Sequence, residues 1–380
     1  MVPLSEVVTL DRKGVHPSEV SPETPYIGLE HIERGGRILP HPQVGDIDLK
    51  SSKFYFFPEH ILYGKLRPNL GKISRPDFAG ICSTDILPLR PHAELDRGYL
   101  AHYLSQPEMI RYATSRTTGV NLPRLSPSSL AKFPIPLPPL GEQRRIAAIL
   151  DQADAIRVKR QQVIAHLSKA VGAIIEPVIA NSSVEVVPLS DLAQVISGIT
   201  KGRKTNVNTR EISYLAVANV QAGHLELGNV KSIQATASEI EKLKLIDGDI
   251  LLTEGGDPDK LGRGTIWRGE IEECIHQNHI FRARVDDVGK IRPLYLNYFL
   301  GSRAARSYFL RSAKQTTGIA SINKTQLNAL PVVLPSISVQ DELITKIEAI
   351  KGVLDLLSSA LDRDNELFAS LQSRAFRGEL

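Results

Sequence analysis

Cysteine is nearly absent from this sequence, since only Cys82 and Cys274 occur among 380 residues. Two cysteines cannot form a disulfide framework or a four-cysteine metal site. The N-terminal residues contain no long apolar run, so no signal peptide is predicted. No apolar run approaches the roughly 18 residues that a membrane span requires. These scarcities predict a soluble protein of a reducing compartment, the cytoplasm, with no membrane partner.

An excess of charge of one sign is also nearly missing. Lysine and arginine number 46 against 42 aspartate and glutamate residues, which gives a net charge of +4. Because nucleic-acid-binding proteins usually carry a strongly basic stripe, this balance permits DNA binding without indicating it. Hydrophobic residues make up 42% of the chain, as in an ordinary globular protein, and the length predicts two or three domains.

Catalytic motifs are lacking as well. An adenine methyltransferase needs Asn/Asp-Pro-Pro followed by an aromatic residue, but Pro138-Pro139 is followed by Leu140. Pro76-Asp77 and Pro258-Asp259 lack the spaced acid-x-Lys element of a metal-dependent nuclease. The glycine-rich loop from residue 198 to 205 lacks the Gly-Lys pair of a phosphate-binding loop. The sequence therefore predicts a non-catalytic protein with no catalytic residues.

Cys274, His276 and His279 have the spacing of metal ligands. They would alternate along a strand, with only one or two side chains on the same face, and no fourth ligand lies nearby. We therefore interpret them as strand residues and predict neither a metal site nor a cofactor.

The chain does contain a long helix with a seven-residue apolar repeat. Pro138 and Pro139 end an extended segment, and a helix is expected from Leu140 to Pro177. It would be roughly 50 Å long, and its apolar stripe needs a partner helix. The predicted seam comprises Ile146, Ile149, Ala153, Ile156, Arg160, Val163 and Leu167.

The second half of the chain repeats the order of the first. Tyr214-Leu215 corresponds to Tyr26-Ile27, Thr316-Thr317-Gly318 to Thr117-Thr118-Gly119, and the cysteines are expected at corresponding places. Gln340 corresponds to Gln143, an offset of 340 − 143 = 197. A second long helix is predicted from Ser338, with the seam residues Leu343, Ile347, Ile350, Leu354, Leu357, Leu361, Asp364 and Phe368.

This duplication predicts an α+β fold with a pseudo-two-fold internal repeat. Two mixed α/β domains, residues 1–136 and 181–335, would be separated by two long helices, residues 137–180 and 336–380, that form an antiparallel coiled coil. Arg160 and Asp364 interrupt the two seams, and we expect them to meet and fix the register. In the alternative, each side chain extends to solvent. Two unlike heads on one frame suit a two-part target such as a DNA site with two half-sites.

The Thr-Thr-Gly-hydrophobic segment, the proline-rich lead and the Glu-Gln or Gln before a long helix each occur twice. In these features the chain resembles the specificity (S) subunits of type I restriction–modification systems. The resemblance implies two target-recognition domains, each reading one half of a bipartite, asymmetric DNA site, and a helical spacer that docks two methyltransferase (M) subunits. Restriction (R) subunits would join through the complex. S-adenosylmethionine, ATP and Mg would act only in the partner subunits.

Candidate DNA-binding residues lie in loops after strands and around the two Thr-Thr-Gly segments. Arginine and asparagine can read base edges, whereas lysine mostly contacts phosphate. In the alternative, these are solvated loop residues and the Thr-Thr-Gly segments are structural turns. The candidates are Lys65, Arg67, Asn69, Lys72, Arg116, Thr118, Asn121, Arg124, Lys201, Arg203, Lys204, Lys260, Arg263, Arg311, Lys314, Thr317 and Asn323.

Two other functions remain open. The chain could be the specificity subunit of a related restriction or phage-defence system with the same architecture. It could also be a coiled-coil scaffold whose heads bind proteins, which the mild net charge favours.

Overall fold

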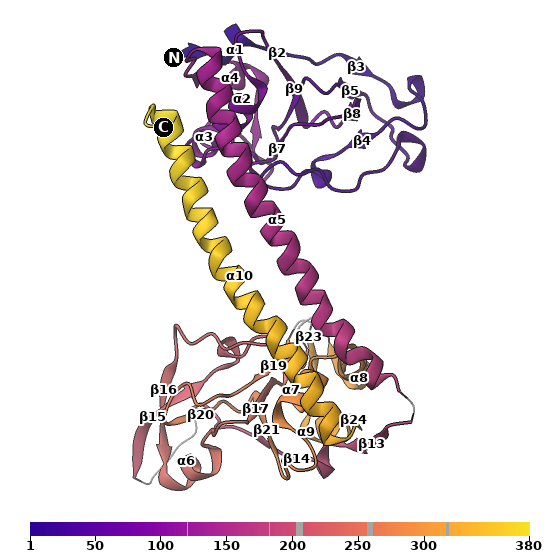
Figure 1. Cartoon of the computed structure of the whole chain (residues 1–380), viewed down its shortest axis with the longest axis vertical. Coiled ribbons are helices and arrows are strands. Elements are labelled where there is room, and N and C mark those ends of the chain that lie inside the picture. The colour runs from indigo at the N-terminus through magenta and orange to yellow at the C-terminus, as the bar shows by residue number, and fades with distance from the viewer. Residues whose placement is uncertain (120, 182, 203–207, 257–260, 317–318) are drawn as a thin grey trace. The chain divides into compact units, whose positions relative to one another are not determined.

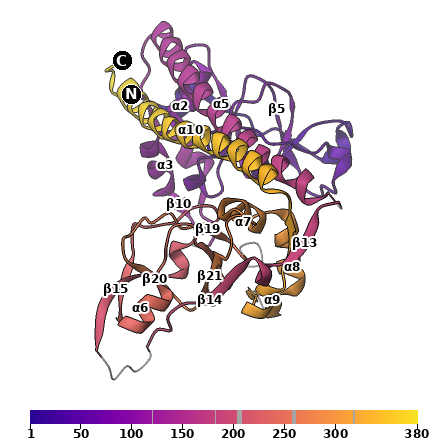
Figure 2. The ribbon, with the colours of Figure 1, turned by 60° about the horizontal axis from the view of Figure 1, so that its bottom comes forward.

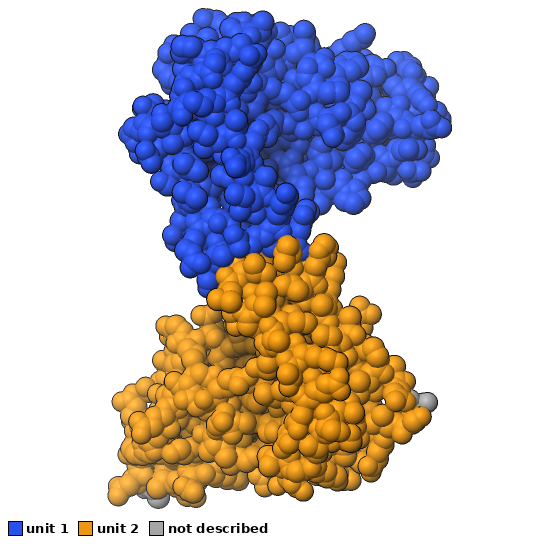
Figure 3. Space-filling view, in the orientation of Figure 1, with its two compact units in different colours: residues 1–162, 359–380 blue, residues 163–358 orange. Residues whose placement is uncertain are grey.

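The computed structural model describes residues 1–380 except 120, 182, 203–207, 257–260 and 317–318 (Figure 1). The chain divides into two compact units, shown in different colours in Figure 3. Unit 1 comprises Met1–Gln162 and Ser359–Leu380, and unit 2 comprises Val163–Ser358. Each unit contains a globular head and one part of each long helix, α5 (Leu140–Ile179) and α10 (Ile337–Arg377). We call residues 1–139 head 1 and residues 180–336 head 2.

Head 1 is built from short strands and short helices. Its strands are β1 (Val2–Pro3), β2 (Val8–Leu10), β3 (Gly14–Val15), β4 (Tyr26–Ile27), β5 (Lys53–Phe56), β6 (Ile61–Gly64), β7 (Ile73–Ser74), β8 (Gly80–Cys82), β9 (Ile86–Pro91), β10 (Thr117–Thr118), β11 (Arg124–Leu125) and β12 (Pro134–Ile135). Its helices are α1 (Leu4–Val7), α2 (Arg97–Leu104), α3 (Pro107–Thr114) and α4 (Pro127–Ala131), with 3-10 turns at Pro17–Glu19, Leu29–His31, Val44–Asp46 and Pro68–Leu70.

Two four-stranded sheets organise head 1. The order β2-β9-β6-β7 is antiparallel throughout, and in β3-β5-β8-β4 only the β4–β8 pair is parallel. Strand β6 lies inside its sheet and is buried at all four positions, which explains its continuous Ile-Leu-Tyr sequence. Leu87, Tyr99 and Leu100 pack with it, and Ala375 of α10 joins this core. Unit 1 is thus completed by a segment from the far end of the sequence.

Head 2 repeats this order of elements. Its strands are β13 (Glu185–Pro188), β14 (Ala193–Ser197), β15 (Thr209–Leu215), β16 (Lys231–Thr236), β17 (Ile250–Thr253), β18 (Gly255–Gly256), β19 (Gly264–Ile266), β20 (Cys274–His276), β21 (Ile280–Val285), β22 (Lys314–Thr316), β23 (Ile319–Ser321) and β24 (Pro331–Leu334). Its helices are α6 (Ala237–Leu243), α7 (Pro293–Leu300), α8 (Arg303–Ser312) and α9 (Lys324–Asn328), with 3-10 turns at Leu189–Asp191 and Val217–Asn219.

One sheet of head 2 matches head 1 in strand order, and the second shares only the parallel strand pair, because β15 is central where its counterpart β4 is at the edge. The sheet β14-β21-β17-β19 is antiparallel, and β16-β15-β20 contains a parallel β15–β20 pair. Helix α6 packs beside β16 and β20 (Figure 2). Leu252, Phe281 and Tyr295 form a core that Ile175 of α5 and Ile347 of α10 join. The α+β class and the repeated order of elements therefore agree with the sequence prediction.

One expected correspondence within the repeat is wrong by two residues. In head 1, Cys82 pairs with Ile27, whereas in head 2 Leu215, the counterpart of Ile27, pairs with His276. Cys274 pairs with Ser213 instead. Both cysteines lie in equivalent strands, but the buried position of Cys82 is occupied by His276, because loops of different length precede the two strands.

Segments of the two long helices run antiparallel within each unit. In unit 1, the Nε of Arg160 donates a hydrogen bond to Oδ2 of Asp364 at 2.7 Å, and Arg157 donates to Asn365. The expected meeting of Arg160 and Asp364 is confirmed. In unit 2, Val171 and Ile174 of α5 pack into the core that contains Leu343 and Ile347.

Part of the predicted seam on α5 is wrong. Ile156 and Val163 are 48% and 45% exposed, whereas Leu150 is fully buried and Arg157 contacts α10. The inward row is therefore one residue further along than Ile149, Ile156 and Val163. Both rows are spaced by seven residues and both contain apolar side chains, so the repeat alone did not distinguish them. Every predicted seam residue of α10 is buried or half-buried.

Helix α5 also differs from expectation in length and composition. It continues two residues past Pro177 to Ile179, which its last turn tolerates because few hydrogen bonds follow. By length and composition it could cross a membrane, and its apolar window is mostly exposed in this chain. The expectation that no segment reaches this length is therefore wrong, although one such helix is weak evidence of a membrane span.

Candidate nucleic-acid interface

Two loops of head 1 that carry candidate DNA-binding residues are joined by backbone hydrogen bonds. Arg67 N donates to the carbonyl of Pro123 at 2.8 Å, and Leu125 N donates to the carbonyl of Lys65 at 2.9 Å. Leu66 and Arg124 form an antiparallel bridge between these bonds. The loop after β6 and the Thr-Thr-Gly segment, 50 residues apart in the sequence, therefore form one surface.

Arg67 has an unusual backbone at this junction. Its φ of 49° and ψ of 61° lie in the left-handed region, where a residue with a Cβ atom is disfavoured. Among the described residues it is the one non-glycine with positive φ. Strain of this kind persists only where the surrounding structure fixes it, and it concentrates at binding and active sites. The side chain of Arg67 is exposed.

The first Thr-Thr-Gly segment is a structural turn. Thr117 pairs with Leu125 and Thr118 with Arg124, and Gly119 has a φ of 93° beyond the hairpin's first strand. The side chains of Thr118 and Asn121 are exposed on the hairpin. This segment is therefore part of a hairpin, and its exposed candidate side chains remain predicted DNA contacts.

Several candidate side chains of head 1 have partners within the protein. Lys72 donates to the carbonyl of Leu29 at 2.7 Å, and Arg116 stacks on the ring of Tyr112 at 3.4 Å. Arg124 donates a long hydrogen bond of 3.3 Å to Asp85. Lys72 is therefore held within its own loop. Within the described residues, the exposed side chains of Arg67, Asn69 and Asn121 make no hydrogen bond or ion pair.

Head 2 forms the equivalent junction from different residues. Gly255 pairs with Ser321 and Gly256 with Ala320, and Ile322 N donates to the carbonyl of Glu254 at 2.9 Å. A Cβ atom on Gly255 would lie 2.9 Å from the carbonyl oxygen of Ala320, so glycine permits this close approach. Gly256 occupies the place that Arg67 has in head 1.

The candidate residues of head 2 are less closely grouped. Lys201 lies over the ring of Tyr214 at 5.2 Å, and Arg311 is exposed on α8. Asn323 caps α9 by accepting a hydrogen bond from Gln326 N, so it has a structural role. Arg263 lies at the mouth of a pocket, and Lys314 lies in β22. Arg203, Lys204, Lys260 and Thr317 lie outside the described residues.

No group of three or more His, Cys, Asp and Glu side chains within the described part of the chain could hold a metal ion. Cys274 and His276 are buried in β20, and His279 pairs with Glu254. Nδ1 of His276 is 3.0 Å from the carbonyl oxygen of Ile280, so it is the protonated nitrogen and donates. Burial lowers the pKa of His276 to about 4, and Nε2 has no partner.

A buried glutamine fastens each head to the start of its long helix. Gln143 Oε1 accepts from Asp96 N at 2.8 Å, and its Nε2 donates to the carbonyls of Glu94 and Pro138. Gln340 makes the same three contacts with Arg292, Lys290 and Pro335. Neither side chain is exposed. We call Gln143 and Gln340 the hinge glutamines.

A second duplicated contact joins each head to its helix with different chemistry. In unit 1, Asp151 of α5 accepts hydrogen bonds from Arg75 and His102. Burial would raise the pKa of Asp151, but the hydrogen bonds from His102 and Arg75 outweigh it and hold the pKa well below its usual value. In unit 2, Glu348 occupies this place between Arg268 and Tyr298.

Comparison with known proteins connects this geometry to a family. Residues 1–167 match the family described as type I restriction modification DNA specificity domain. The EcoKI specificity subunit of Escherichia coli K12 is 26% identical over 325 residues, which cover 80% of this chain and 69% of the relative. The StySPI specificity subunit of Salmonella potsdam is 28% identical with the same coverage. The chain is similar to the type I specificity subunits over most of its length.

Solved structures share the fold of this chain. A chain from a study of complex assembly and conformational transition of the type I R-M system aligns with a TM-score of 0.58 at 16% identity, covering 100% of this chain and 97% of that one. The S subunit from M. genitalium aligns with a TM-score of 0.57 at 15% identity, covering 99% and 95%. These similarities associate the chain with DNA sequence specificity.

The sequence predicts the hinge glutamines only as corresponding positions of the repeat, without their buried hydrogen bonds. Their signal was the recurrence of glutamine at the same distance from a proline-rich lead, 340 − 143 = 197 residues apart. A polar residue in the first turn of an otherwise apolar junction indicates a buried hydrogen-bonding role. The strained backbone of Arg67 could not be predicted, because a positive φ at a residue other than glycine has no recognisable sequence pattern.

Proposed function

We propose that this chain is a specificity subunit that reads a bipartite, asymmetric DNA site, with head 1 and head 2 each recognising one half. The duplicated junction supports this proposal most directly. In each head, the loop after β6 or β17 pairs with the segment before α4 or α9. In head 1, the exposed side chains of Arg67, Asn69 and Asn121 lie at this junction. The same frame carries different residues in the two heads, as two different half-sites require.

We further propose that α5 and α10 act as an antiparallel coiled-coil spacer with pseudo-two-fold symmetry. The hydrogen bonds of Arg157 and Arg160 to α10 in unit 1, and the shared core of Val171 and Ile347 in unit 2, support it. A spacer of fixed length would set the number of unread base pairs between the half-sites.

The spacer would also dock two methyltransferase subunits. Large apolar side chains remain exposed on both helices, although each helix has already buried one stripe. Exposed apolar patches of this kind mark protein interaction surfaces. These side chains are Ile156, Val163, Val353, Leu356 and Leu367.

In this proposal the chain is a non-catalytic subunit in the cytoplasm. S-adenosylmethionine, ATP and Mg would act in the methyltransferase and restriction subunits, and the restriction subunits would join through the complex. The specificity subunit would supply only the choice of DNA sequence and the positions of its partners.

The first experiment measures DNA selection by the chain assembled with its methyltransferase subunits. Methylation of a random-sequence library, followed by sequencing, should give a two-part site. Arg67→Ala should lower methylation of that site about tenfold or relax one position of one half-site, because one bidentate base contact contributes about 1–3 kcal/mol. Arg90→Ala is the matched control, since Arg90 is exposed and pairs with Asp11 away from the junction. Methylation without sequence preference would refute the proposal.

The second experiment changes the spacer. Seven residues inserted into both helices preserve the repeat and lengthen each helix by about 10 Å, near three base-pair steps. Four residues inserted into one helix break the repeat and should prevent assembly. An unchanged gap after the paired seven-residue insertion would contradict the spacer proposal while leaving DNA reading intact.

A further inference from the structure

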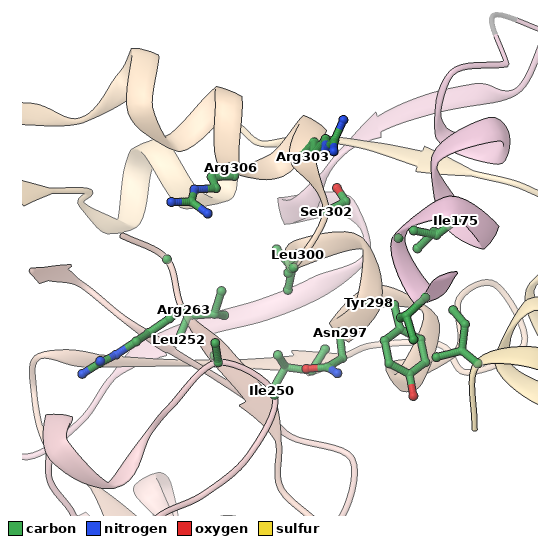
Figure 4. A pocket seen from close by; sticks show the side chains of 18 of the residues that line it. Ile175, Ile250, Leu252, Arg263, Asn297, Tyr298, Leu300, Ser302, Arg303 and Arg306 are labelled. Atoms are coloured by element: carbon green, nitrogen blue, oxygen red, sulfur yellow. The ribbon is translucent and has the colours of Figure 1, made fainter. Parts of the chain in front are cut away.

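Unit 2 contains a pocket of about 530 Å³ (Figure 4). It is lined by the last turns of α5, by α7 and α8, by β17 and the start of β19, and by the first half of α10. In Figure 4, Arg303 and Arg306 lie on one side of the opening, and Ile250 and Leu252 lie on the other. All of these residues belong to unit 2, so the pocket is a property of this unit alone.

The pocket combines an apolar interior with a basic rim. Its apolar lining includes Val171, Ile175, Leu252, Leu261, Leu300, Phe309, Ile347 and Leu354. Its charged lining consists of Arg263, Arg303, Arg306, Lys351 and a single acid, Glu176. Within the described residues, the guanidinium groups of Arg263 and Arg303 make no hydrogen bond or ion pair. This surface complements a ligand with an apolar tip and negative charge.

Unit 1 has different side chains at the positions equivalent to two residues of the pocket. The helices are offset by 337 − 140 = 197 residues, so Phe368 of α10 corresponds to Val171 of α5. Phe368 lies under the guanidinium of Arg157 at 4.3 Å and beside His102. Ile110 of α3 stands where α8 has Arg306, counting from the start of each helix. At these two equivalent positions, unit 1 has a phenylalanine and an isoleucine, whereas unit 2 has a valine and an arginine that line the pocket.

The pocket also continues into the apolar helix surface of unit 2. Leu354 and Lys351 line it, and the neighbouring Val353 and Leu356 of α10 are 47% and 73% exposed. A partner that covers this helix surface would therefore reach the pocket with the same segment. A free small molecule would leave the adjoining apolar side chains uncovered.

We propose that this pocket receives an acidic segment of one methyltransferase subunit, with an apolar side chain inserted and carboxylates facing Arg263 and Arg303. The proposal rests on the proposed docking of methyltransferases and deepens it. Because unit 1 has Phe368 and Ile110 at the positions of Val171 and Arg306, the two methyltransferase subunits bind with unequal affinity, and the tighter one contacts unit 2.

Val171→Phe tests the proposal by placing in unit 2 the residue that unit 1 has. Native mass spectrometry and titration with purified methyltransferase subunit should show two subunits bound to the wild-type chain. The variant should bind one subunit as before and the other about 30-fold more weakly, because a filled pocket removes a central anchor. Ala173→Phe is the matched control, since Ala173 is exposed on α5 and does not line the pocket.

Arg303→Glu tests the charge without changing the core. It should weaken the same binding event about tenfold and reduce its salt dependence, since a rim cation acts through charge complementarity. Lys290→Glu, an exposed change of the same charge elsewhere in head 2, should leave both events unchanged. Because Arg303 is a rim residue, this variant keeps the test valid if Val171→Phe does not fold.

Each remaining outcome decides between the proposals. Equal binding of both methyltransferase subunits by the wild type and by Arg303→Glu would overturn the pocket proposal alone. A small anion found on the wild-type chain but displaced in Val171→Phe, with methyltransferase binding unchanged, would overturn it too. A wild-type chain that selects no DNA site and binds no methyltransferase would instead overturn the proposed function.

Discussion

The two parts of the helix pair are held together by different chemistry. In unit 1, Arg160 meets Asp364 through a hydrogen-bonded ion pair. The corresponding positions in unit 2 are Leu357 and Leu167, since 357 − 160 and 364 − 167 are both 197. Leucine seams slide more easily than a seam with one polar pair, whose groups are satisfied in a single register. Unit 1 therefore defines the register of the helices, and unit 2 contributes apolar contact.

The two heads share the contacts that attach them to the long helices but differ in the paired loops that carry candidate DNA-binding residues. The hinge glutamines make the same hydrogen bonds in both units, and Tyr99 and Tyr295 each donate to a carbonyl of the helix lead. The paired loops share only their backbone, with Arg67 in head 1 and Gly256 in head 2. The contacts between head and helix are thus made by the same residue types in both units. The candidate DNA-binding surface is made by different residues in each head.

The largest expected effect comes from the hinge glutamines, where the units are alike. Gln143→Ala should destabilise unit 1, and Gln340→Ala should destabilise unit 2, each by about 3 kcal/mol, because each leaves three buried backbone groups unpaired. Hydrogen exchange resolved by segment would assign the loss to one unit. If either substitution lowered the stability of both units, the two units would unfold together and not independently.

The next effect should distinguish the heads by pH. The pKa of His276 is lowered from 6.5 to about 4, so between these values the unfolded state binds more protons than the folded state. The stability of unit 2 should be full above pH 6.5 and fall with decreasing pH, by about 2 kcal/mol at pH 5. Head 1 has Cys82 at this position and should not respond.

His276→Cys, which copies the residue of head 1, is the matched variant. It should lower the stability of unit 2 at neutral pH, since the hydrogen bond to Ile280 is lost. It should also flatten the dependence between pH 7 and 5. A variant that keeps the full pH dependence would place the titrating group elsewhere.

The difference between the helix segments predicts a smaller effect. Arg160→Leu or Asp364→Leu alone should cost about 1.5 kcal/mol, because the remaining charge loses its partner in a half-buried site. Both substitutions together reproduce the leucine pair of unit 2 and should recover most of this loss. A double-mutant cycle by thermal unfolding measures the coupling. Additive losses would mean that Arg160 and Asp364 have no interaction energy with each other, so that the ion pair does not fix the register of the helices.

The smallest effect concerns the strained residue of the reading surface. Arg67→Gly, which copies Gly256, should stabilise unit 1 by about 1 kcal/mol, because glycine adopts the left-handed backbone without strain. The same variant should select DNA less well, since it removes an exposed arginine. A loss of both stability and selection would argue that Arg67 is held by its contacts rather than strained.

Much of the fold could be predicted from the sequence because the repeat and the helices have strong periodic signals. The starts of α5 and α10 and the pairing of Arg160 with Asp364 followed from prolines and from interrupted heptads. The inward row of α5 did not, since Leu150 and Ile149 are adjacent and equally apolar. The candidate site was predicted as separate loops, because the backbone bonds from Arg67 to Pro123 connect residues whose side chains carry no shared pattern.

The composition of unit 1 has a consequence for how the chain is made. Its core includes Ala375, so head 1 is synthesised before unit 2 but lacks part of its packing until the residues around Ala375 follow. Unit 2 is one continuous segment and is complete earlier. The two parts of unit 1 are separated by 358 − 162 = 196 residues. At a synthesis rate of about 5–20 residues per second, roughly 10–40 s pass between the synthesis of head 1 and that of the remaining residues of its core.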